Sequence, residues 1–232
     1  MGYPGGKNGA GIYQTIINQI PPHTTYIEPF LGGGAIMRLK KPADKSIGID
    51  MDKAVVEGFP AHQVPGSSIV YGDGIYYLES LMFDRQYLNN PSTFIYLDPP
   101  YVLSTRTRLL YNYELSDGDH HRLLAIIKLL RCNIAISGYY SQMYALSLQH
   151  WREINYQAKT RGNTMKTEYL WMNYDPPQEL HDYRYLGDNY RQRENLARKK
   201  SRWIERLNRM PLLEKYALLS AIQTTQEKET TT

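Results

Sequence analysis

The chain has 232 residues, of which 42% are hydrophobic, and a formal net charge of +4. That length fits one compact domain with an appendage, and the hydrophobic content suffices for a core. No apolar run is long enough to span a bilayer, and the amino terminus lacks the pattern of a signal peptide. The single cysteine, Cys132, excludes a disulfide within the chain, and the six histidines lack the spacing of metal ligands. We therefore expect a cytoplasmic protein without a metal site; the oligomeric state is not defined by the sequence.

Helical and strand-like segments alternate along the chain. Apolar periodicity and cap residues predict helices over residues 9–20, 34–40, 52–59, 117–130 and 139–148. Strands are predicted over residues 26–30, 47–50, 69–73, 94–97, 133–137, 151–157 and 167–174. This order indicates an α/β fold.

Three of the early strands end in residues suited to bind a ligand. Strand 26–30 runs into a glycine turn, residues 32–34, that opens a helix. Glycines let the backbone approach a ligand closely, and the N–H groups of a helix start can bind it. The next two strands end at Asp50 and Asp73, where a carboxylate can bind ribose hydroxyls. The glycine spacing differs from that of the dinucleotide-binding fingerprint.

The residues Asp98-Pro99-Pro100-Tyr101 follow the apolar strand 94–97. In α/β folds, ligands bind at the carboxyl edge of the sheet. An amino group on a nucleobase is a poor nucleophile because its lone pair is delocalised into the ring. Hydrogen-bond acceptors such as the Asp98 carboxylate and the Pro99 carbonyl can draw that lone pair out of the plane, and Tyr101 can stack on the base. Taken alone, the same residues also fit a strand that ends in a tight turn.

Together these motifs resemble, in the same order, those of the Dam-type (D12 class) N6-adenine-specific DNA methyltransferases. The resemblance extends from Tyr3 to Tyr174. Residues 3–7, Tyr-Pro-Gly-Gly-Lys, are similar to the family's amino-terminal motif, and residues 29–34, Pro-Phe-Leu-Gly-Gly-Gly, to its glycine motif. Asp98-Pro99-Pro100-Tyr101 is similar to the catalytic signature. Arg161 with residues 168–174 is similar to the last family motif, which flanks the target pocket.

The resemblance implies a Rossmann-like methyltransferase fold, a seven-stranded mostly parallel sheet with one antiparallel strand, and S-adenosyl-L-methionine as cofactor. The implied catalytic residues are Asp98, Pro99 and Tyr101. The implied cofactor site consists of Tyr3, Gly6, Lys7, Pro29, Phe30, Gly32, Gly34, Asp50, Asp73 and Asp98. Within it, Asp50 would bind the ribose and Asp73 would lie near the adenine ring.

Several of these residues also have ordinary structural interpretations. Lys7 fits a lysine at a helix start, and Asp50 and Asp73 fit caps at strand ends, because Asp is common in turns. Residues 173–177, Asn-Tyr-Asp-Pro-Pro, look like a second copy of the signature, but they follow the polar end of a strand and are better interpreted as its terminator.

Two basic segments are candidates for contact with nucleic acid. Residues 104–113 are polar, basic and aromatic and are expected to form a lid over the flipped base, with Arg106 and Arg108 on phosphates and Tyr111 nearby; a solvated surface loop is the alternative. Residues 184–215 carry ten Lys or Arg against four acids, a net charge of +6, so the rest of the chain carries −2.

The carboxyl-terminal segment is expected to be a separate basic extension. We predict a catalytic domain over residues 1–178 and an extension over 179–232, with helices at 194–209 and 212–223 and a disordered polar tail from Thr224. Basic side chains on its first helix are candidate contacts to DNA, the alternatives being a solvated helix or a dimerisation element. These side chains are Arg198, Lys199, Lys200 and Arg202.

The sequence therefore predicts a methyltransferase that acts on a flipped adenine N6 in double-stranded DNA. The alternatives are a related enzyme that acts on RNA adenine or on cytosine N4 in DNA, and a catalytically idle nucleic-acid-binding module. The leading Asp98 favours the first interpretation, because relatives of the other two enzyme kinds usually begin the tetrapeptide with Asn or Ser. Only 48 positions separate Asp50 from Asp98, which leaves little room for the target-recognition insert of the Dam-like relatives. In addition, Gly2 stands before Tyr3, where relatives often carry a base-contacting lysine. Relaxed sequence selectivity is therefore expected.

Overall fold

Seven strands form one sheet, in the order β3-β2-β1-β4-β5-β7-β6, in a computed structural model that describes residues 5–84, 90–159 and 164–230. The strands are β1 (Thr25–Glu28), β2 (Lys45–Asp50), β3 (Ser67–Tyr71), β4 (Thr93–Leu97), β5 (Asn133–Gly138), β6 (Arg152–Lys159) and β7 (Met165–Met172). Strand β7 pairs antiparallel with β5 and with β6, and the other neighbouring pairs are parallel. The predicted fold, a mostly parallel seven-stranded sheet with one antiparallel strand, is confirmed.

Side chains of the central strands alternate between two buried layers. On β1, Tyr26 belongs to one hydrophobic cluster and Ile27 to the other, and on β4 Phe94 and Ile95 divide in the same way. Successive side chains of a strand point to opposite faces of the sheet. Both faces of these strands are therefore covered, as is typical of parallel sheets with helices on each side.

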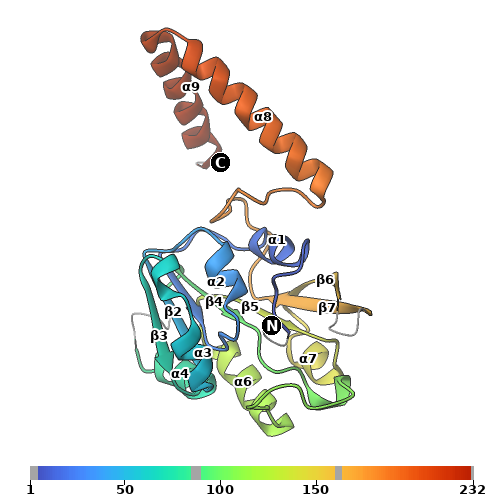
Figure 1. Ribbon diagram of the computed structural model, residues 1–232. Helices are drawn as coiled ribbons and strands as arrows, with labels where there is room; N and C mark the ends of the chain where they lie inside the picture. Colours follow the sequence, from blue (N-terminus) through green and yellow to red (C-terminus); the bar gives the residue numbers. More distant parts are fainter. Residues whose placement is uncertain (1–4, 85–89, 160–163, 231–232) are drawn as a thin grey trace. The chain divides into compact units, whose positions relative to one another are not determined.

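Helices cover the two faces of the sheet (Figure 1). On one face, α4 (Gly74–Leu81), α6 (Asp117–Leu129) and α7 (Gln142–Ser147) contribute to the first cluster; on the other, α1 (Ile12–Ile17), α2 (Ala35–Leu39) and α3 (Lys53–Gly58) contribute to the second. Two short 3-10 helices, η1 (Ala61–Gln63) and η2 (Leu103–Thr105), lie in connections. Among the described residues, no helix combines the length and apolar character needed to cross a membrane.

Helix α4 was not predicted from the sequence. The carboxylate of Asp73 accepts hydrogen bonds from the N–H groups of Ile75 and Tyr76, at 2.7 and 3.3 Å, and so caps the helix. Asp is among the preferred residues at this position. The buried side chains of Ile75 and Leu78 then hold α4 against the sheet, so the helix depends on packing as well as on its cap.

The strand order reverses between β1 and β4. From β1 the chain continues outward through β2 and β3, and it then returns to β4 on the other side of β1. In open α/β sheets such a reversal creates a crevice at the carboxyl ends of the two strands, where ligands bind. Here those ends carry the glycine turn after Glu28 and the residues that begin at Asp98.

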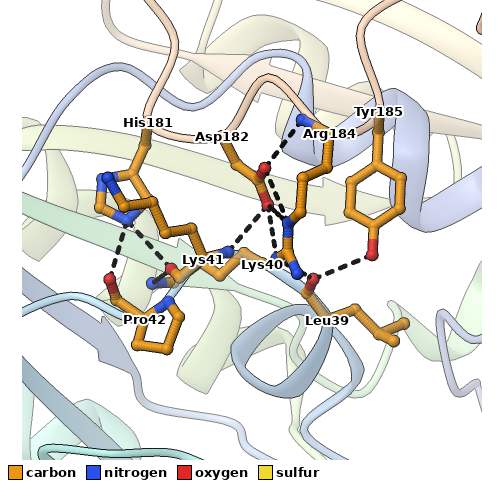
Figure 2. A network of polar contacts seen from close by, with 8 residues as sticks. All are labelled: Leu39, Lys40, Lys41, Pro42, His181, Asp182, Arg184 and Tyr185. Atoms are coloured by element: carbon orange, nitrogen blue, oxygen red, sulfur yellow. Dashed lines mark hydrogen bonds and ion pairs between the residues drawn. The ribbon is translucent and has the colours of Figure 1, made fainter. Parts of the chain in front are cut away.

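The last segment of the sheet domain is bonded to the connection between α2 and β2 (Figure 2). The Asp182 carboxylate accepts from the Lys41 N–H at 2.8 Å and from the Arg184 guanidinium at 2.7 Å, and the Tyr185 hydroxyl donates to the Leu39 carbonyl at 3.1 Å. The Nε2 atom of His181 lies within hydrogen-bond distance of the Lys41 and Pro42 carbonyls, at 3.0 and 3.3 Å. The sequence placed the end of the catalytic domain at residue 178, whereas the compact unit runs to Tyr185.

Residues Leu186–Thr232 form a second unit made of two helices, α8 (Tyr190–Arg209) and α9 (Leu212–Thr230). Helix α8 begins four residues before the predicted start because the Asn189 side chain accepts from the Gln192 N–H at 3.0 Å. Helix α9 continues to Thr230, past Thr224, where the sequence favoured disorder. In this part of the helix the hydroxyls of Thr224 and Thr225 donate to the carbonyls of Ser220 and Ala221, one turn back, at 3.0 and 2.9 Å.

Candidate active site

The glycine turn between β1 and α2 is tied to the end of β2. The Gly32 N–H donates to the Asp50 carboxylate at 2.8 Å. Gly34 has a φ of 56°, in the left-handed region that favours glycine, and a Cβ there would lie 2.3 Å from a ring atom of Phe59. The glycines therefore permit a backbone path, and a contact with Phe59 beside α3, that a larger residue would block.

A first cavity opens over this turn and contains about 760 Å³ of empty space, including space open to solvent. Most of the residues predicted for the cofactor line it; these are Gly6, Lys7, Pro29, Phe30, Gly32, Gly34, Asp50 and Asp98. Tyr3 lies outside the described residues. Asp73 is not part of the lining, although Gly74 beside it is.

Asp50 and Asp73, two of the three aspartates predicted to bind the cofactor, accept hydrogen bonds from backbone N–H groups. Asp50 accepts from the N–H groups of Gly32 and Asp52, both at 2.8 Å, and it lines the first cavity. Burial raises the pKa of Asp50, and these two hydrogen bonds oppose that rise. Asp73 caps α4, as described above, so its structural interpretation holds whether or not it also contacts a ligand.

Lys7 connects the residues of the Asp98 motif. Its ammonium lies 2.7 Å from each carboxylate oxygen of Asp98 and 2.7 Å from the Tyr101 hydroxyl, and it also donates to the Gly5 carbonyl at 3.2 Å. The ammonium is 3.5 Å from a carboxylate oxygen of Glu168 on β7. The alternative interpretation of Lys7 as an ordinary lysine at a helix start does not fit the structure, since α1 begins at Ile12 and only 3% of the Lys7 side chain is exposed.

Lys7 and Asp98 each shift the pKa of the other. Burial disfavours the ammonium of Lys7, but the carboxylates of Asp98 and Glu168 outweigh burial and raise the pKa of Lys7 above its ordinary value. Burial raises the pKa of Asp98, and Lys7 counteracts that rise. Lys7 therefore favours the ionised, hydrogen-bond-accepting form of a buried carboxylate.

Tyr101 and Pro99 are both enclosed. The Tyr101 ring is 5% exposed and packs edge-on against Tyr139, with 4.6 Å between ring centroids. Pro99 is buried, whereas Pro100 lines the first cavity. The proposed stacking of Tyr101 on a base thus requires the base to enter beside Tyr139.

Glu28, at the end of β1, is a second buried carboxyl group in the first cavity. Its Oε2 accepts from the Tyr26 hydroxyl at 2.8 Å and from the Met37 N–H at 3.2 Å. Burial raises the pKa of Glu28 to about 8, although both hydrogen bonds oppose the rise. Sequence reasoning missed this residue, yet it stands directly before the glycine motif.

A second cavity shares part of its lining with the first. Gly5, Gly6, Lys7 and Tyr111 line both cavities. The second cavity is also lined by aromatic, basic and acidic side chains that include Tyr101, Arg108, Tyr139, Lys159, Lys166 and Glu168. Lys7, bonded to Asp98, therefore belongs to the walls of both cavities.

The loop after Tyr101 borders both cavities. Glu114 organises it, because its Oε1 accepts from the N–H groups of Leu110 and Tyr111, at 2.7 and 3.1 Å, and its carboxylate pairs with both terminal nitrogens of Arg106. The Asn112 side chain donates to the Asp52 carboxylate at 2.8 Å, next to the first cavity. The loop was expected to lie over a flipped base alone; in the structure it also borders the proposed cofactor cavity.

The basic side chains that were predicted to contact phosphates differ in their solvent exposure. Only 3% of the Arg106 side chain is exposed, and its guanidinium is paired with Glu114, so it is not presented to a phosphate. Arg108 is exposed, and Tyr111 lies between the cavities. Arg161 lies outside the described residues. The basic residues of α8 that were predicted to contact DNA are all exposed; they are Arg198, Lys199, Lys200 and Arg202.

The residues that sequence reasoning missed lie mainly on the last two strands. Glu168 was recognised only as part of a motif, and its partner Tyr156 was not considered, although the two are opposite each other in the β6–β7 pairing. No sequence signal marks Tyr156, because an alternating strand contains many such positions. Among the described residues, no group of three or more His, Cys, Asp or Glu side chains could hold a metal ion.

No protein-family model and no curated protein sequence matches the chain. Solved structures with a similar fold include a putative RNA methyltransferase from Pyrococcus horikoshii, with 10% identity, a TM-score of 0.47, and coverage of 70% of this chain and 80% of the other. An rRNA methylase from Streptococcus thermophilus has 12% identity, a TM-score of 0.43, and coverage of 73% and 95%. A SAM-dependent methyltransferase from Anabaena variabilis has 11% identity, a TM-score of 0.42, and coverage of 67% and 76%.

Proposed function

We propose that the protein transfers a methyl group from S-adenosyl-L-methionine to the N6 amino group of a flipped adenine in DNA. The observation that carries the proposal is the position of Asp98 and Lys7. Asp98 lines the first cavity, and Lys7, bonded to it at 2.7 Å, lines both. A donor in the first cavity and a base in the second would meet at this carboxylate.

The first cavity suits a cationic adenosine derivative. Among the residues that the structure describes, its lining contains four carboxyl groups, those of Glu28, Asp50, Asp52 and Asp98, but only one basic side chain, Lys7. The glycines of the turn, residues 32–34, line the cavity without side chains, which lets a ligand approach the backbone closely. When bound, S-adenosyl-L-methionine supplies an electrophilic methyl group on a positively charged sulfur. Asp50 would bind ribose hydroxyls, since carboxylate oxygens accept more than one hydrogen bond each.

The residues around Asp98 would make the amino group nucleophilic. The Asp98 carboxylate and the Pro99 carbonyl would accept its two N–H groups and draw its lone pair out of the ring plane. The N–C bond forms as the C–S bond breaks, and the nitrogen then loses one proton to its acceptor or to water. Tyr101 and Tyr139 offer aromatic surfaces for the extruded base, which flipping enzymes commonly use.

The exposed basic face of α8 supports a nucleic-acid partner. Neutralising phosphates with Lys and Arg releases counterions, which favours binding without base recognition. Double-stranded DNA is the substrate we propose, because the tetrapeptide begins with Asp98, as in the adenine-specific DNA enzymes that the sequence resembles.

A transfer assay with tritiated methyl donor on DNA, on RNA and without nucleic acid tests the proposal. We expect label on N6 of adenine in DNA. Asp98→Ala should reduce the rate at least about a hundredfold, the usual effect of removing one such electrostatic interaction, while circular dichroism shows a folded protein. Transfer to RNA alone would reassign the substrate. Near-normal turnover by Asp98→Ala would refute the mechanism.

A further inference from the structure

The ammonium of Lys7 has more acceptors around it than it has hydrogens to donate. Two oxygens of Asp98, the Tyr101 hydroxyl and the Gly5 carbonyl all lie within 3.2 Å of it. A lysine ammonium has three N–H donors. At least one of these four contacts is therefore shared or weak.

Glu168, which lines the second cavity, is a fifth acceptor close to Lys7. Its Oε2 is 3.5 Å from the Lys7 ammonium, and the Tyr156 hydroxyl donates to the same oxygen at 3.1 Å. The Glu168 side chain is 8% exposed. Glu168 lines the second cavity and does not belong to the lining of the first. It is therefore a buried carboxylate held beside the base site.

A target amino group that binds Asp98 competes with Lys7 for the carboxylate. In the structure both Asp98 oxygens are bonded to the ammonium, so an arriving amino group must share an oxygen with Lys7, which weakens the pairing of Lys7 with Asp98. A buried ammonium whose partner is weakened is disfavoured. A second anion within reach of the ammonium would offset that loss when the base arrives.

We propose that Glu168 is a positioning residue that takes over the Lys7 ammonium when the target amino group binds Asp98. This inference rests on the proposed function. Lys7 keeps Asp98 ionised before the base enters, and Glu168 keeps Lys7 paired afterwards. Glu168 acts through Lys7 and not on the reacting atoms, so its importance depends on the lysine being present.

A double-mutant cycle tests that dependence. The four proteins are the wild type, Glu168→Gln, Lys7→Met and the double variant; glutamine at 168 still accepts the Tyr156 hydrogen bond. Glu168→Gln should lower kcat about tenfold or more, the factor that matches coupling of about 1.4 kcal/mol within one polar network. The KM for S-adenosyl-L-methionine should change less than about twofold, because Glu168 is not part of the first cavity. In the Lys7→Met background, the same change should have almost no effect on kcat.

A second measurement is independent of turnover. The pKa of Asp98, followed by ¹³C NMR of labelled aspartate, should fall on Glu168→Gln, since Lys7 then pairs with Asp98 alone. The fall should be clearly smaller when Lys7 is replaced by methionine, because only the direct repulsion between the carboxylates is removed. Glu153→Gln is the matched control: Glu153 is an exposed residue of β6 that accepts from Trp171 and lines neither cavity, and it should leave both measurements unchanged.

The outcomes separate the two proposals. Equal effects of Glu168→Gln with and without Lys7, in rate or in the pKa of Asp98, would overturn the role of Glu168, as would an unchanged kcat. If the wild type methylates no nucleic acid, the proposed function fails, and the NMR cycle alone decides whether Glu168 and Asp98 share Lys7.

Discussion

Cofactor binding should release a proton from Glu28. The free protein holds this carboxyl group with a pKa of about 8, chiefly because it is buried. At pH 7 about nine tenths of the Glu28 side chains are therefore protonated, and at pH 9 about one tenth. A cationic ligand in the first cavity, which Glu28 lines, favours the carboxylate and lowers its pKa.

The expected release is therefore up to about 0.9 proton per bound cofactor at pH 7 and about 0.1 at pH 9. Isothermal titration calorimetry of S-adenosyl-L-methionine in buffers with different ionisation enthalpies measures it directly. The affinity should also rise with pH up to about pH 8, since the proton must leave before the cation gains its partner.

Glu28→Gln is the matched control, because glutamine keeps an acceptor for Tyr26 and Met37 but does not titrate. The variant should show a release smaller by the amount assigned to Glu28 and a flatter dependence of affinity on pH. Proton release that is absent in the wild type, or equal in the variant, would refute the coupling between Glu28 and the cofactor.

Four further outcomes are expected. The pKa of Glu28 is higher in the folded state than in the unfolded state, so its contribution to stability is present at low pH and is lost as pH rises. The wild type should therefore become less stable relative to Glu28→Gln between about pH 4.5 and about pH 8, by at most ~1.4 kcal/mol per pH unit. Urea titrations that show the opposite slope would contradict this. Glu114→Ala removes the acceptor of two backbone N–H groups and of Arg106, so the cofactor Kd should rise about tenfold or more, measured against the exposed-residue control Glu57→Gln; an unchanged Kd would show that loop order is irrelevant. Removal of residues 186–232 should weaken DNA binding and reduce its salt slope by roughly one unit for each phosphate that the extension neutralises, whereas an unchanged slope would assign the extension to another role. Mapping of N6-methyladenine by long-read sequencing should show a short or degenerate context, because each base-edge interaction contributes only roughly 1 to 3 kcal/mol of discrimination and few are available; a strict motif of four or more bases would contradict this.

The strands could be predicted because their burial pattern is local. Carboxylate residues were expected at the carboxyl ends of the early strands. In the structure Asp50 ends β2 and Asp98 directly follows β4. Helix α4 was missed because the sequence at its start, Asp73-Gly74, also fits a turn. What decides between them is the packing of Ile75 and Leu78 on the sheet, which is a long-range effect.

The sequence could indicate the parts of the candidate site that short motifs form. It could not indicate side-chain contacts between residues that are distant in the sequence. The glycine turn lines one cavity together with Asp98 and Pro100 of the Asp98 motif. By contrast, the pairing of Arg106 with Glu114 depends on a loop closing on itself, and the contact of Glu168 with Lys7 joins residues 161 positions apart. Charge alone suggested phosphate contact for Arg106, whereas an internal carboxylate proved to be the nearer partner.

The hydrogen bonds of residues 181–185 affect where the chain can be truncated. A chain cut at residue 178 would lack the Asp182 carboxylate and leave the Lys41 N–H without the acceptor that it has in Figure 2. A cut after Tyr185 keeps that bond and the one from Tyr185 to Leu39. The compact sheet unit ends at Tyr185, so a truncation that removes the helical extension after this residue keeps the hydrogen bonds of Asp182 and Tyr185 within the sheet unit.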